Sequence, residues 1–476
     1  MNPLHFFNNS PMLETLYPGD AQNAVAQRAH EHRPRSFRDN IPVLMDSNQH
    51  KERWYCHIYS VGATLVFLFL LVVVISVATI GGKLGLQVPP LATHDLYVET
   101  YGSDTAGDGT QARPFATISR ASHGADGVSG ASPGATIRVG PGLYNLTRTI
   151  FTTASGTAAA PIIYLSTILW GARLNAHVFG ESVWLNRGSY VHILGFELSG
   201  GYRTGVWSEG RYVTVAQCYI HDIGNSFQCG AEGAGLDHAA AIFAPMRNTA
   251  SLLQARSGFN TVVQNVITRV GGGQCNGSPA LADGIYSAGD GDTIANNVIF
   301  ANAGNGIYVS CAAPRCSRPS MTVAFNLLAN NSGSGFHLDS SSSLPPEGLC
   351  SDNILVYNAK HGLYSNKPFV VSSFMTSTNI VHANSLGCSN QPASYSCSSQ
   401  IYLNPRLSSS HLAPLGEASQ LPTQLLQFKP SCRSPCLGAG SAVGVALADS
   451  GFVDFNGSPR TLSSEVIGPF LGDTSC

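Results

Sequence analysis

A short motif, an asparagine followed by two aliphatic residues, recurs five times in the second half of the chain at intervals of 26 to 32 residues. The five copies begin at Asn265, Asn297, Asn326, Asn353 and Asn379. A repeat of this period indicates small structural units, none of which can bury its apolar face alone. The fold must therefore bring the five copies into equivalent positions on neighbouring units.

A second motif alternates with the first: a small residue, then an aliphatic residue or Phe, then an aromatic residue or His. Its copies are Gly284-Ile285-Tyr286, Gly306-Ile307-Tyr308, Gly335-Phe336-His337 and Gly362-Leu363-Tyr364, with two similar triplets upstream, Gly205-Val206-Trp207 and Ala241-Ile242-Phe243. Short β-branched and aromatic segments closed by Gly, Asn or Ser favour strands and tight turns over helices.

These repeats predict an all-β chain that folds as a right-handed parallel β-helix. Leucine-rich repeats are excluded because the Leu framework is missing, and propeller blades because each period holds too few strand segments. We expect the repeated Asn side chains to stack, so that each amide links neighbouring coils and satisfies backbone groups in the bend.

Composition excludes several classes of protein. Charged residues make up only 11% of the chain, Gly numbers 50, and the net charge is -2. This composition suits a turn-rich β protein and argues against a nucleic-acid partner. The chain also lacks the signatures of ATP-binding, nicotinamide-binding and metalloprotease sites.

An uncharged segment near the N-terminus predicts a membrane anchor. Residues 54–82 contain no Asp, Glu, Lys or Arg, and their apolar core is long enough to cross a bilayer as a helix. The basic residues Arg38, Lys51 and Arg53 precede it, which places the N-terminal tail in the cytosol. We expect a type II, single-pass membrane protein whose large domain is lumenal, in the Golgi, or extracellular. The predicted parts are a disordered tail (1–53), a signal-anchor helix (54–82), a stem (83–95), the β-helix with its caps (96–470) and a C-terminal tail (471–476).

Cysteines and glycosylation motifs agree with that topology. Eleven of the 12 cysteines follow the predicted anchor, and an oxidising compartment would allow disulfides. The expected local pairs are Cys311 with Cys316, Cys388 with Cys397 and Cys432 with Cys436; Cys218, Cys229 and Cys275 flank long insertions, and Cys350 or Cys476 would be left over. Acceptor motifs for N-glycosylation begin at Asn145, Asn276, Asn330 and Asn456.

Both ends of the large domain carry motifs of a known family. The N-terminal ones are Tyr101-Gly102-Ser103-Asp104, Gly107-Asp108-Gly109-Thr110, Pro114-Phe115-Ala116-Thr117-Ile118 and Pro141-Gly142-Leu143-Tyr144; the C-terminal ones are Ser434-Pro435-Cys436-Leu437-Gly438 and Asp454-Phe455-Asn456-Gly457-Ser458-Pro459-Arg460. With them the chain resembles secreted right-handed β-helix proteins related to pectate lyases, a superfamily active on polysaccharides. The resemblance implies a capped solenoid with a polysaccharide as substrate or ligand. The motifs that carry catalysis in polygalacturonases, epimerases and pectate lyases are absent.

Strand alternation predicts a binding face on the outer wall. If Ile285, Ile307, Phe336 and Leu363 point inward, then Tyr286, Tyr308, His337 and Tyr364 point outward. Two residues further on, the same face should present Ala288, Ser310, Asp339 and Asn366, with Asp290 and Lys367 close by. Such a stripe is suited to binding sugar rings, with Tyr286, Tyr308 and Tyr364 as substrate-binding residues. The alternative is an aromatic ladder that only stabilises the coils.

Candidate catalytic residues lie on this stripe and in the Gly-rich excursions that precede it. Polysaccharide lyases and C5-epimerases remove a proton next to a sugar carboxylate, for which His238, His337 or Lys367 could serve as the base, with Asp339 beside them. Arg247 could pair with the carboxylate, and Asp237, Asp283 and Asp339 could hold Ca2+. His221 and Asp222 belong to the same region, or form a capping pair in a turn.

Two functions therefore remain open. The first is a membrane-anchored lyase or C5-epimerase that acts on an acidic glycan. The second is a non-catalytic glycan-binding or adhesion protein at the cell surface.

Overall fold

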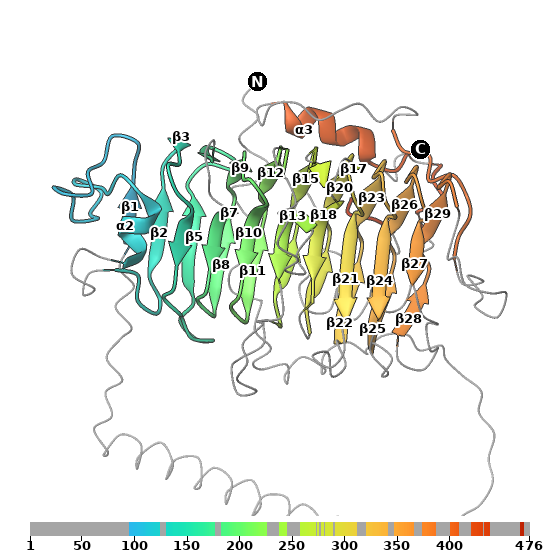
Figure 1. Ribbon diagram of the computed structural model, residues 1–476, viewed down its shortest axis with the longest axis horizontal. Coiled ribbons are helices and arrows are strands. Elements are labelled where there is room, and N and C mark those ends of the chain that lie inside the picture. The colour runs from blue at the N-terminus through green and yellow to red at the C-terminus, as the bar shows by residue number, and fades with distance from the viewer. Residues whose placement is uncertain are drawn as a thin grey trace, which may run out of the picture. The chain divides into compact units, whose positions relative to one another are not determined.

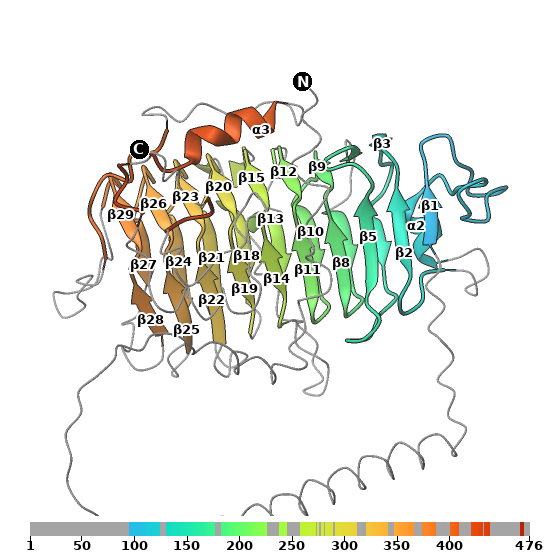
Figure 2. The same cartoon turned by 180° about the vertical axis from the view of Figure 1, so that it is seen from behind.

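Short strands of the chain join three parallel sheets in turn, so that each complete coil contributes one strand to each sheet (Figures 1 and 2). The computed structural model describes residues 95–123, 130–176, 182–225, 238–244, 258–272, 274–275, 278–279, 281–288, 291–311, 320–340, 347–365, 374–386, 400–408, 420–431, 433–437 and 467–470. In these ranges no helix has the length and apolarity needed to cross a membrane. The predicted anchor, residues 54–82, lies outside them.

The strands of each sheet follow the order of the chain. The first sheet contains β1 (Asp95–Val98), β2 (Thr136–Val139), β5 (Ile162–Ser166), β8 (Val191–Leu194), β11 (Val213–Ala216), β14 (Thr261–Val263), β19 (Thr293–Ala295), β22 (Ser320–Ala324), β25 (Glu347–Ser351) and β28 (Phe374–Ser377). The second contains β4 (Ile150–Thr152), β7 (Ser182–Asn186), β10 (Thr204–Ser208), β13 (His238–Ala244), β18 (Leu281–Ser287), β21 (Ile307–Cys311), β24 (Phe336–Ser340) and β27 (Leu363–Ser365). The third contains β3 (Gly142–Asn145), β6 (Ala172–Asn175), β9 (Glu197–Ser199), β12 (Tyr219–His221), β15 (Val266–Thr268), β20 (Val298–Phe300), β23 (Leu327–Ala329), β26 (Ile354–Val356) and β29 (Ile380–His382). A separate antiparallel pair joins β16 (Gln274–Cys275) to β17 (Ser278–Pro279).

The interior of the solenoid is a continuous apolar core. It includes Ile285, Ile307, Phe336 and Leu363, each no more than 1% exposed, from consecutive strands of the second sheet. The predicted parallel β-helix and the predicted inward residues are therefore confirmed.

Two ladders of asparagines hold the coils together; the repeat predicted the first of them and not the second. In the first, Asn265, Asn297, Asn326, Asn353 and Asn379 follow one another; each donates its backbone N–H and side-chain amide to Oδ1 of the next, over 2.8 to 3.0 Å. The second runs through Asn302, Asn331, Asn358 and Asn384 with distances of 2.8 to 3.1 Å. Buried amides with satisfied partners stabilise one alignment of the coils over all others.

Helical segments cover an end and a flank of the solenoid. The helix α2 (Ile118–His123) contacts β1, β2 and β4 at the N-terminal end, which shields strand edges there. The helix α3 (Leu421–Gln424) and the 3-10 helix η3 (Leu425–Phe428) lie along the outer face of the third sheet (Figure 1). The rings of Phe300 and Phe428 meet there at 5.3 Å.

The cysteines correct one prediction. Cys218, Cys350 and Cys436 are buried free thiols. The expected disulfide between Cys432 and Cys436 is therefore wrong, and Cys218 forms none with its neighbours in sequence. Burial raises the pKa of the Cys436 thiol to about 12, so the side chain acts as a small apolar group in the cluster under η3. Two glycosylation motifs fall in the described ranges, and their acceptors Asn145 and Asn330 are exposed.

Candidate functional site

One row of side-chain positions runs across all eight strands of the second sheet in a single register. From β4 to β27 the paired residues are Phe151, Leu185, Trp207, Phe243, Tyr286, Tyr308, His337 and Tyr364. The residue preceding each position, from Ile150 to Leu363, belongs to the interior core, so alternation places the described side chains of the row on the outer face. We call these eight positions the aromatic row. It contains the four residues predicted to point outward and the third position of each of the two upstream triplets.

The rings of the row touch one another along its C-terminal half. Tyr286 and Tyr308 have centroids 5.3 Å apart, Tyr308 and His337 4.8 Å, and His337 and Tyr364 4.6 Å. His361, in the turn before β27, stacks on Tyr364 at 4.8 Å. Tyr308 is 8% exposed, whereas Tyr286, His337 and Tyr364 are half-buried. The structure thus brings together the four aromatic or His residues of the predicted stripe, whereas Asp290, Asn366 and Lys367 lie outside the described residues.

Each of two tyrosines in the row reaches a polar side chain on the following strand. The Tyr308 hydroxyl donates a hydrogen bond of 2.7 Å to Oδ2 of Asp339 on β24. The Tyr286 hydroxyl forms a hydrogen bond with Ser310 on β21. Ser310 and Asp339 are themselves register partners, as the spacing predicted.

The environment of Tyr308 keeps its hydroxyl protonated. Burial raises the pKa of Tyr308, and the hydrogen bond to Asp339 with the negative charges of Asp339 and Asp283 raises it further. Burial also raises the pKa of Tyr286. A tyrosine in this state can donate a proton but cannot serve as a base at neutral pH.

Asp283 has a structural role that the sequence did not indicate. It is fully buried, and its Oδ1 accepts hydrogen bonds from the backbone N–H (2.8 Å) and the amide (2.9 Å) of Asn305. The Oδ1 of Asn305 in turn accepts from the backbone N–H of Ser334. Asp283, within β18, thus begins a third ladder that runs through Asn305 to Ser334, which argues against its predicted role as a calcium ligand.

No group of three His, Cys, Asp or Glu side chains within the described ranges could hold a metal ion. Asp237, another predicted calcium ligand, lies outside these ranges, as do Arg247 and Lys367. The backbone of His238 begins β13 and pairs with Leu281. Among the predicted catalytic residues, the structure therefore brings His337 and Asp339 together on β24.

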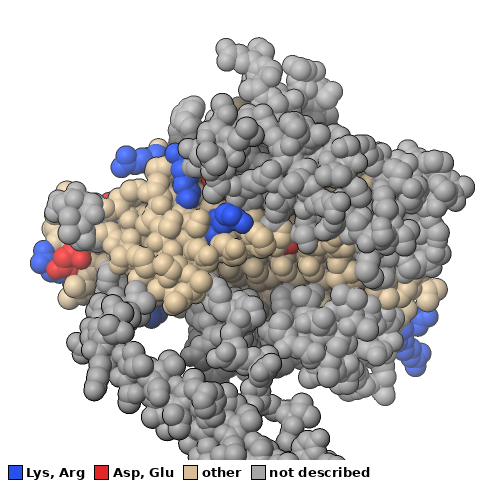
Figure 3. Space-filling view, turned by 90° about the horizontal axis from the view of Figure 1, so that it is seen from below, with Lys and Arg blue, Asp and Glu red and all other residues tan. Residues whose placement is uncertain are grey.

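Basic side chains flank the N-terminal half of the aromatic row. The guanidinium carbon of Arg187 lies 5.1 Å from the centroid of the Phe151 ring, and its Nε donates to Oε2 of Glu209 at 2.9 Å. The guanidinium of Arg203 lies 5.6 Å from Trp207, but this residue is only 9% exposed. Figure 3, a view from below Figure 1, shows separate basic side chains and few acidic ones on the described surface. Nothing in the sequence singles out these arginines, because they lie outside the triplet motif.

A second polar cluster lies on the outer face of the third sheet. His221 contacts Oδ2 of Asp222 through Nδ1 (2.7 Å) and Oε1 of Glu197 through Nε2 (3.2 Å). Arg269 donates to both carboxylate oxygens of Asp222 at 2.9 and 2.8 Å. The His221 ring also stacks on Tyr219 at 4.2 Å. His221 and Asp222 thus belong to an ion-pair network across β9, β12 and β15.

The charges in this cluster stabilise one another. Burial alone would lower the pKa of His221, but the hydrogen bonds of Asp222 and Glu197 outweigh it and raise the pKa. Burial would raise the pKa of Asp222, whereas His221 and Arg269 hold it well below its usual range. The cluster binds three coils together, a role closer to the predicted capping pair than to a catalytic site.

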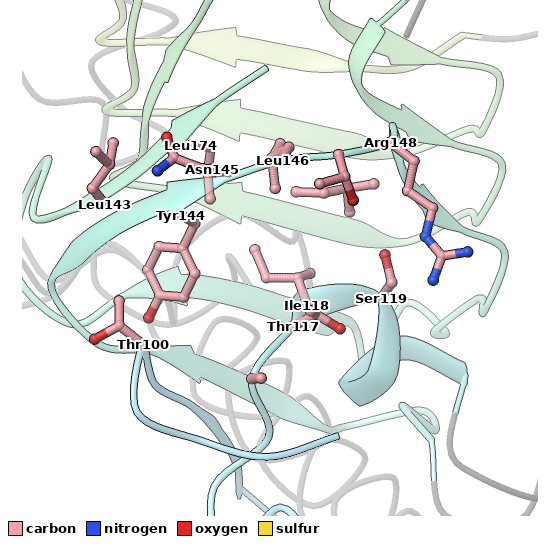
Figure 4. Close-up of a pocket in the computed structure, with 13 residues that line it drawn as sticks. Thr100, Thr117, Ile118, Ser119, Leu143, Tyr144, Asn145, Leu146, Arg148 and Leu174 are labelled. Atoms are coloured by element: carbon pink, nitrogen blue, oxygen red, sulfur yellow. The ribbon is translucent and has the colours of Figure 1, made fainter. Parts of the chain in front are cut away.

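A pocket of about 280 Å³ lies at the N-terminal end of the solenoid, between α2 and the turn from β3 to β4 (Figure 4). Figure 4 shows Arg148 and Ser119 at one end of the pocket and Tyr144 and Thr100 at the other. The Tyr144 hydroxyl donates to the Gly140 carbonyl at 2.9 Å, so it belongs to the wall. The lining offers hydroxyls and one guanidinium, but no pair of groups suited to acid and base catalysis.

No protein-family model matches the chain. A search of curated proteins likewise finds no match. Solved structures do match: pectate lyase Pel9A is 15% identical, and the match covers 81% of this chain and 98% of that one with a TM-score of 0.52. A rhamnogalacturonan lyase is 13% identical, with 77% and 94% covered and a TM-score of 0.42. The A-module of the Azotobacter vinelandii mannuronan C-5 epimerase AlgE6 is 13% identical, with 53% and 68% covered and a TM-score of 0.33.

The likeness to pectate lyase establishes the fold. At 15% identity it shows a parallel β-helix of the pectate lyase type and nothing about catalytic residues.

Proposed function

We propose that this protein is a polysaccharide lyase or C5-epimerase that acts on an acidic glycan bound along the aromatic row. The observation that carries the proposal is the hydrogen bond of 2.7 Å from Tyr308 to Asp339, next to the ring of His337. It places a protonated hydroxyl, a carboxylate and an imidazole on one face of rigid strands. The fold shared with pectate lyase supports the choice of a polysaccharide.

In the proposed reaction, His337 removes the proton from the sugar carbon next to the carboxylate. In a lyase, the electron pair of that C–H bond forms a carbon–carbon double bond, and the glycosidic C–O bond on the adjacent carbon breaks. The Tyr308 hydroxyl turns from Asp339, which positions it beforehand, and donates its proton to the leaving oxygen. His337 then gives its proton to water and Tyr308 takes one from water, which restores both side chains. In an epimerase, the glycosidic bond stays intact and the carbanion takes a proton from a water molecule on the opposite face of the ring; the hydroxide that remains accepts the proton held by His337.

The residues that would hold Ca2+ are the predicted ligands Asp237, Asp283 and Asp339. Oδ1 of Asp283 already accepts two hydrogen bonds from Asn305, and Oδ2 of Asp339 accepts one from Tyr308. When bound, Ca2+ would stabilise the carboxylate of the sugar during proton removal. Activity that survives EDTA would remove Ca2+ from the proposal.

We also propose that residues 54–82 anchor the protein as a type II membrane protein with the β-helix on the lumenal or extracellular side. The support is the uncharged segment and the basic residues that precede it. Protease treatment of intact microsomes should remove the N-terminal tail and leave the β-helix.

The decisive experiment incubates the full chain, purified in detergent, with pectate, alginate and other acidic polysaccharides. A lyase produces an unsaturated sugar that absorbs ultraviolet light, and an epimerase changes the proton NMR spectrum without shortening the polymer. His337→Ala and Asp339→Ala should abolish turnover with little change in melting temperature. His382→Ala, on the third sheet, is the matched control and should retain full activity.

Binding of an acidic glycan without any product would contradict the enzymatic proposal. That outcome would favour the second function, a non-catalytic glycan-binding protein.

A further inference from the structure

We propose that Arg187 is an anchor for a carboxylate of the bound glycan, at the opposite end of the aromatic row from Tyr308. This inference deepens the proposed function, because it specifies a long, acidic chain as the ligand. It depends on the contacts of Arg187 with residues on or next to β4 and β10, and none of these residues takes part in the proposed reaction.

Arg187 lies on the outer face of the second sheet. It directly follows β7, two residues beyond Leu185, so its side chain points to the same side as the aromatic row. The side chain is 45% exposed. Arg203, the other arginine beside the row, is too buried to reach a ligand.

Two contacts fix the plane of the Arg187 guanidinium. It lies over the Phe151 ring, 5.1 Å from the centroid, and its Nε is bonded to Oε2 of Glu209 at 2.9 Å. A guanidinium held in one orientation loses little conformational freedom when it binds a ligand. These contacts therefore prepare the group for recognition.

The outer edge of the same guanidinium is available for a ligand. Within the described part of the chain, Nε of Arg187 donates one hydrogen bond, to Glu209. Neither of its two Nη atoms has a protein acceptor there. Two parallel N–H groups of a guanidinium match the two oxygens of a carboxylate. A uronate is the sugar unit that carries such a group.

The position of Arg187 also sets a minimum length for the ligand. Four strand spacings separate β7 from β21, which corresponds to roughly 19 Å along the sheet. No single sugar unit spans this distance. A ligand that contacts both Arg187 and Tyr308 must be an oligosaccharide laid across the intervening strands, and its acidic group at Arg187 lies several units from the reacting one.

The test compares long and short oligouronates on the full chain. Arg187→Ala should raise KM for decamers of galacturonate or alginate about tenfold, the effect of losing one charge-assisted contact, and leave kcat unchanged. Dimers should be turned over equally by both proteins, because a dimer cannot contact both Arg187 and Tyr308. Arg187→Lys should restore only part of the affinity because the planar fork is lost. Arg173→Ala, an exposed arginine on β6 in the third sheet, is the control.

The first two of the following outcomes separate the anchor from the proposed function. Turnover of acidic decamers with the same KM in Arg187→Ala and wild type would overturn the anchor and leave the proposed function standing. Calorimetric binding of decamers that depends on Arg187, without turnover, would support the anchor and overturn the enzymatic function. Absence of binding to any acidic decamer would overturn the anchor.

Discussion

The hydroxyl of Tyr308 donates a 2.7 Å hydrogen bond to Asp339 across two neighbouring coils. The two residues are 31 positions apart in sequence, yet the ladder of the second sheet makes them neighbours. Because the coils on both sides are rigidly aligned, the pair is positioned without a mobile loop.

Tyr308→Phe should reduce turnover at least a hundredfold, the usual contribution of a positioned proton donor. The cost in folding stability should be about 1 kcal/mol, for one lost hydrogen bond. Activity of the wild-type protein should show no alkaline decline at the ordinary pKa of tyrosine, because the pKa of Tyr308 is raised. Steady-state rates between pH 6 and pH 11 would check both points, with Tyr357→Phe on the third-sheet side as the control. Normal activity of Tyr308→Phe would exclude this hydroxyl as the donor.

Asn353→Leu should destabilise the solenoid by about 2 to 4 kcal/mol, because buried partners lose their hydrogen bonds. Its Oδ1 accepts two hydrogen bonds from Asn326, and its amide donates to the Val323 carbonyl and to Asn379. Urea denaturation measures the change. The exposed Asn145→Ala variant should stay within about 0.5 kcal/mol of wild type. Equal stability of the two variants would show that the ladder adds nothing to the strands.

The His221 cluster should make stability depend on pH. The pKa of His221 is raised in the folded state, so its contribution is complete below the ordinary value of 6.5 and is lost as pH rises through the folded pKa. The pKa of Asp222 is lowered, so its contribution is present above 3.8 and is lost as pH falls. Urea midpoints should therefore decrease on both sides of a maximum between these limits. His221→Phe should remove the alkaline decrease; an unchanged profile would contradict this assignment.

Cys218, Cys350 and Cys436 should not react with iodoacetamide at pH 8 while the protein is folded. Their burial raises the pKa of each thiol, to about 12 for Cys218 and Cys436, and keeps the reagent out. After unfolding in urea without a reducing agent, all three should be alkylated. Peptide mass spectrometry identifies the labelled sites, and a disulfide-linked Cys436 peptide would contradict the structure.

Much of the fold could be predicted because the sequence repeat corresponds directly to the structural repeat, the coil. The interval between Asn265 and Asn297 equals one coil, and the alternation after Gly306 assigns Ile307 to the core and Tyr308 to the outer face. The repeat interval and the strand alternation are local features of the sequence, and parallel stacking of the coils repeats them along the solenoid.

The contacts of the polar side chains could not be predicted in the same way, because they depend on which coils are neighbours outside the regular repeat. Glu197 and His221 meet only because β9 and β12 are adjacent, and neither lies in a recurring motif. Likewise, nothing in the sequence distinguishes Asp283 as a ladder residue from a metal ligand. The pairing of Cys436 was predicted from close spacing alone, which gives no information on side-chain direction.

The asparagine ladders have an evolutionary consequence. Every coil from Asn265 to Asn384 meets the next through the same amide contacts, so a duplicated coil would fit between its parents without new side chains. Each duplication would add one position to the aromatic row. Duplication of the gene segment that encodes one coil would therefore lengthen the aromatic row, and with it the stretch of polymer that the row could contact. The amino-acid composition of each coil would stay the same.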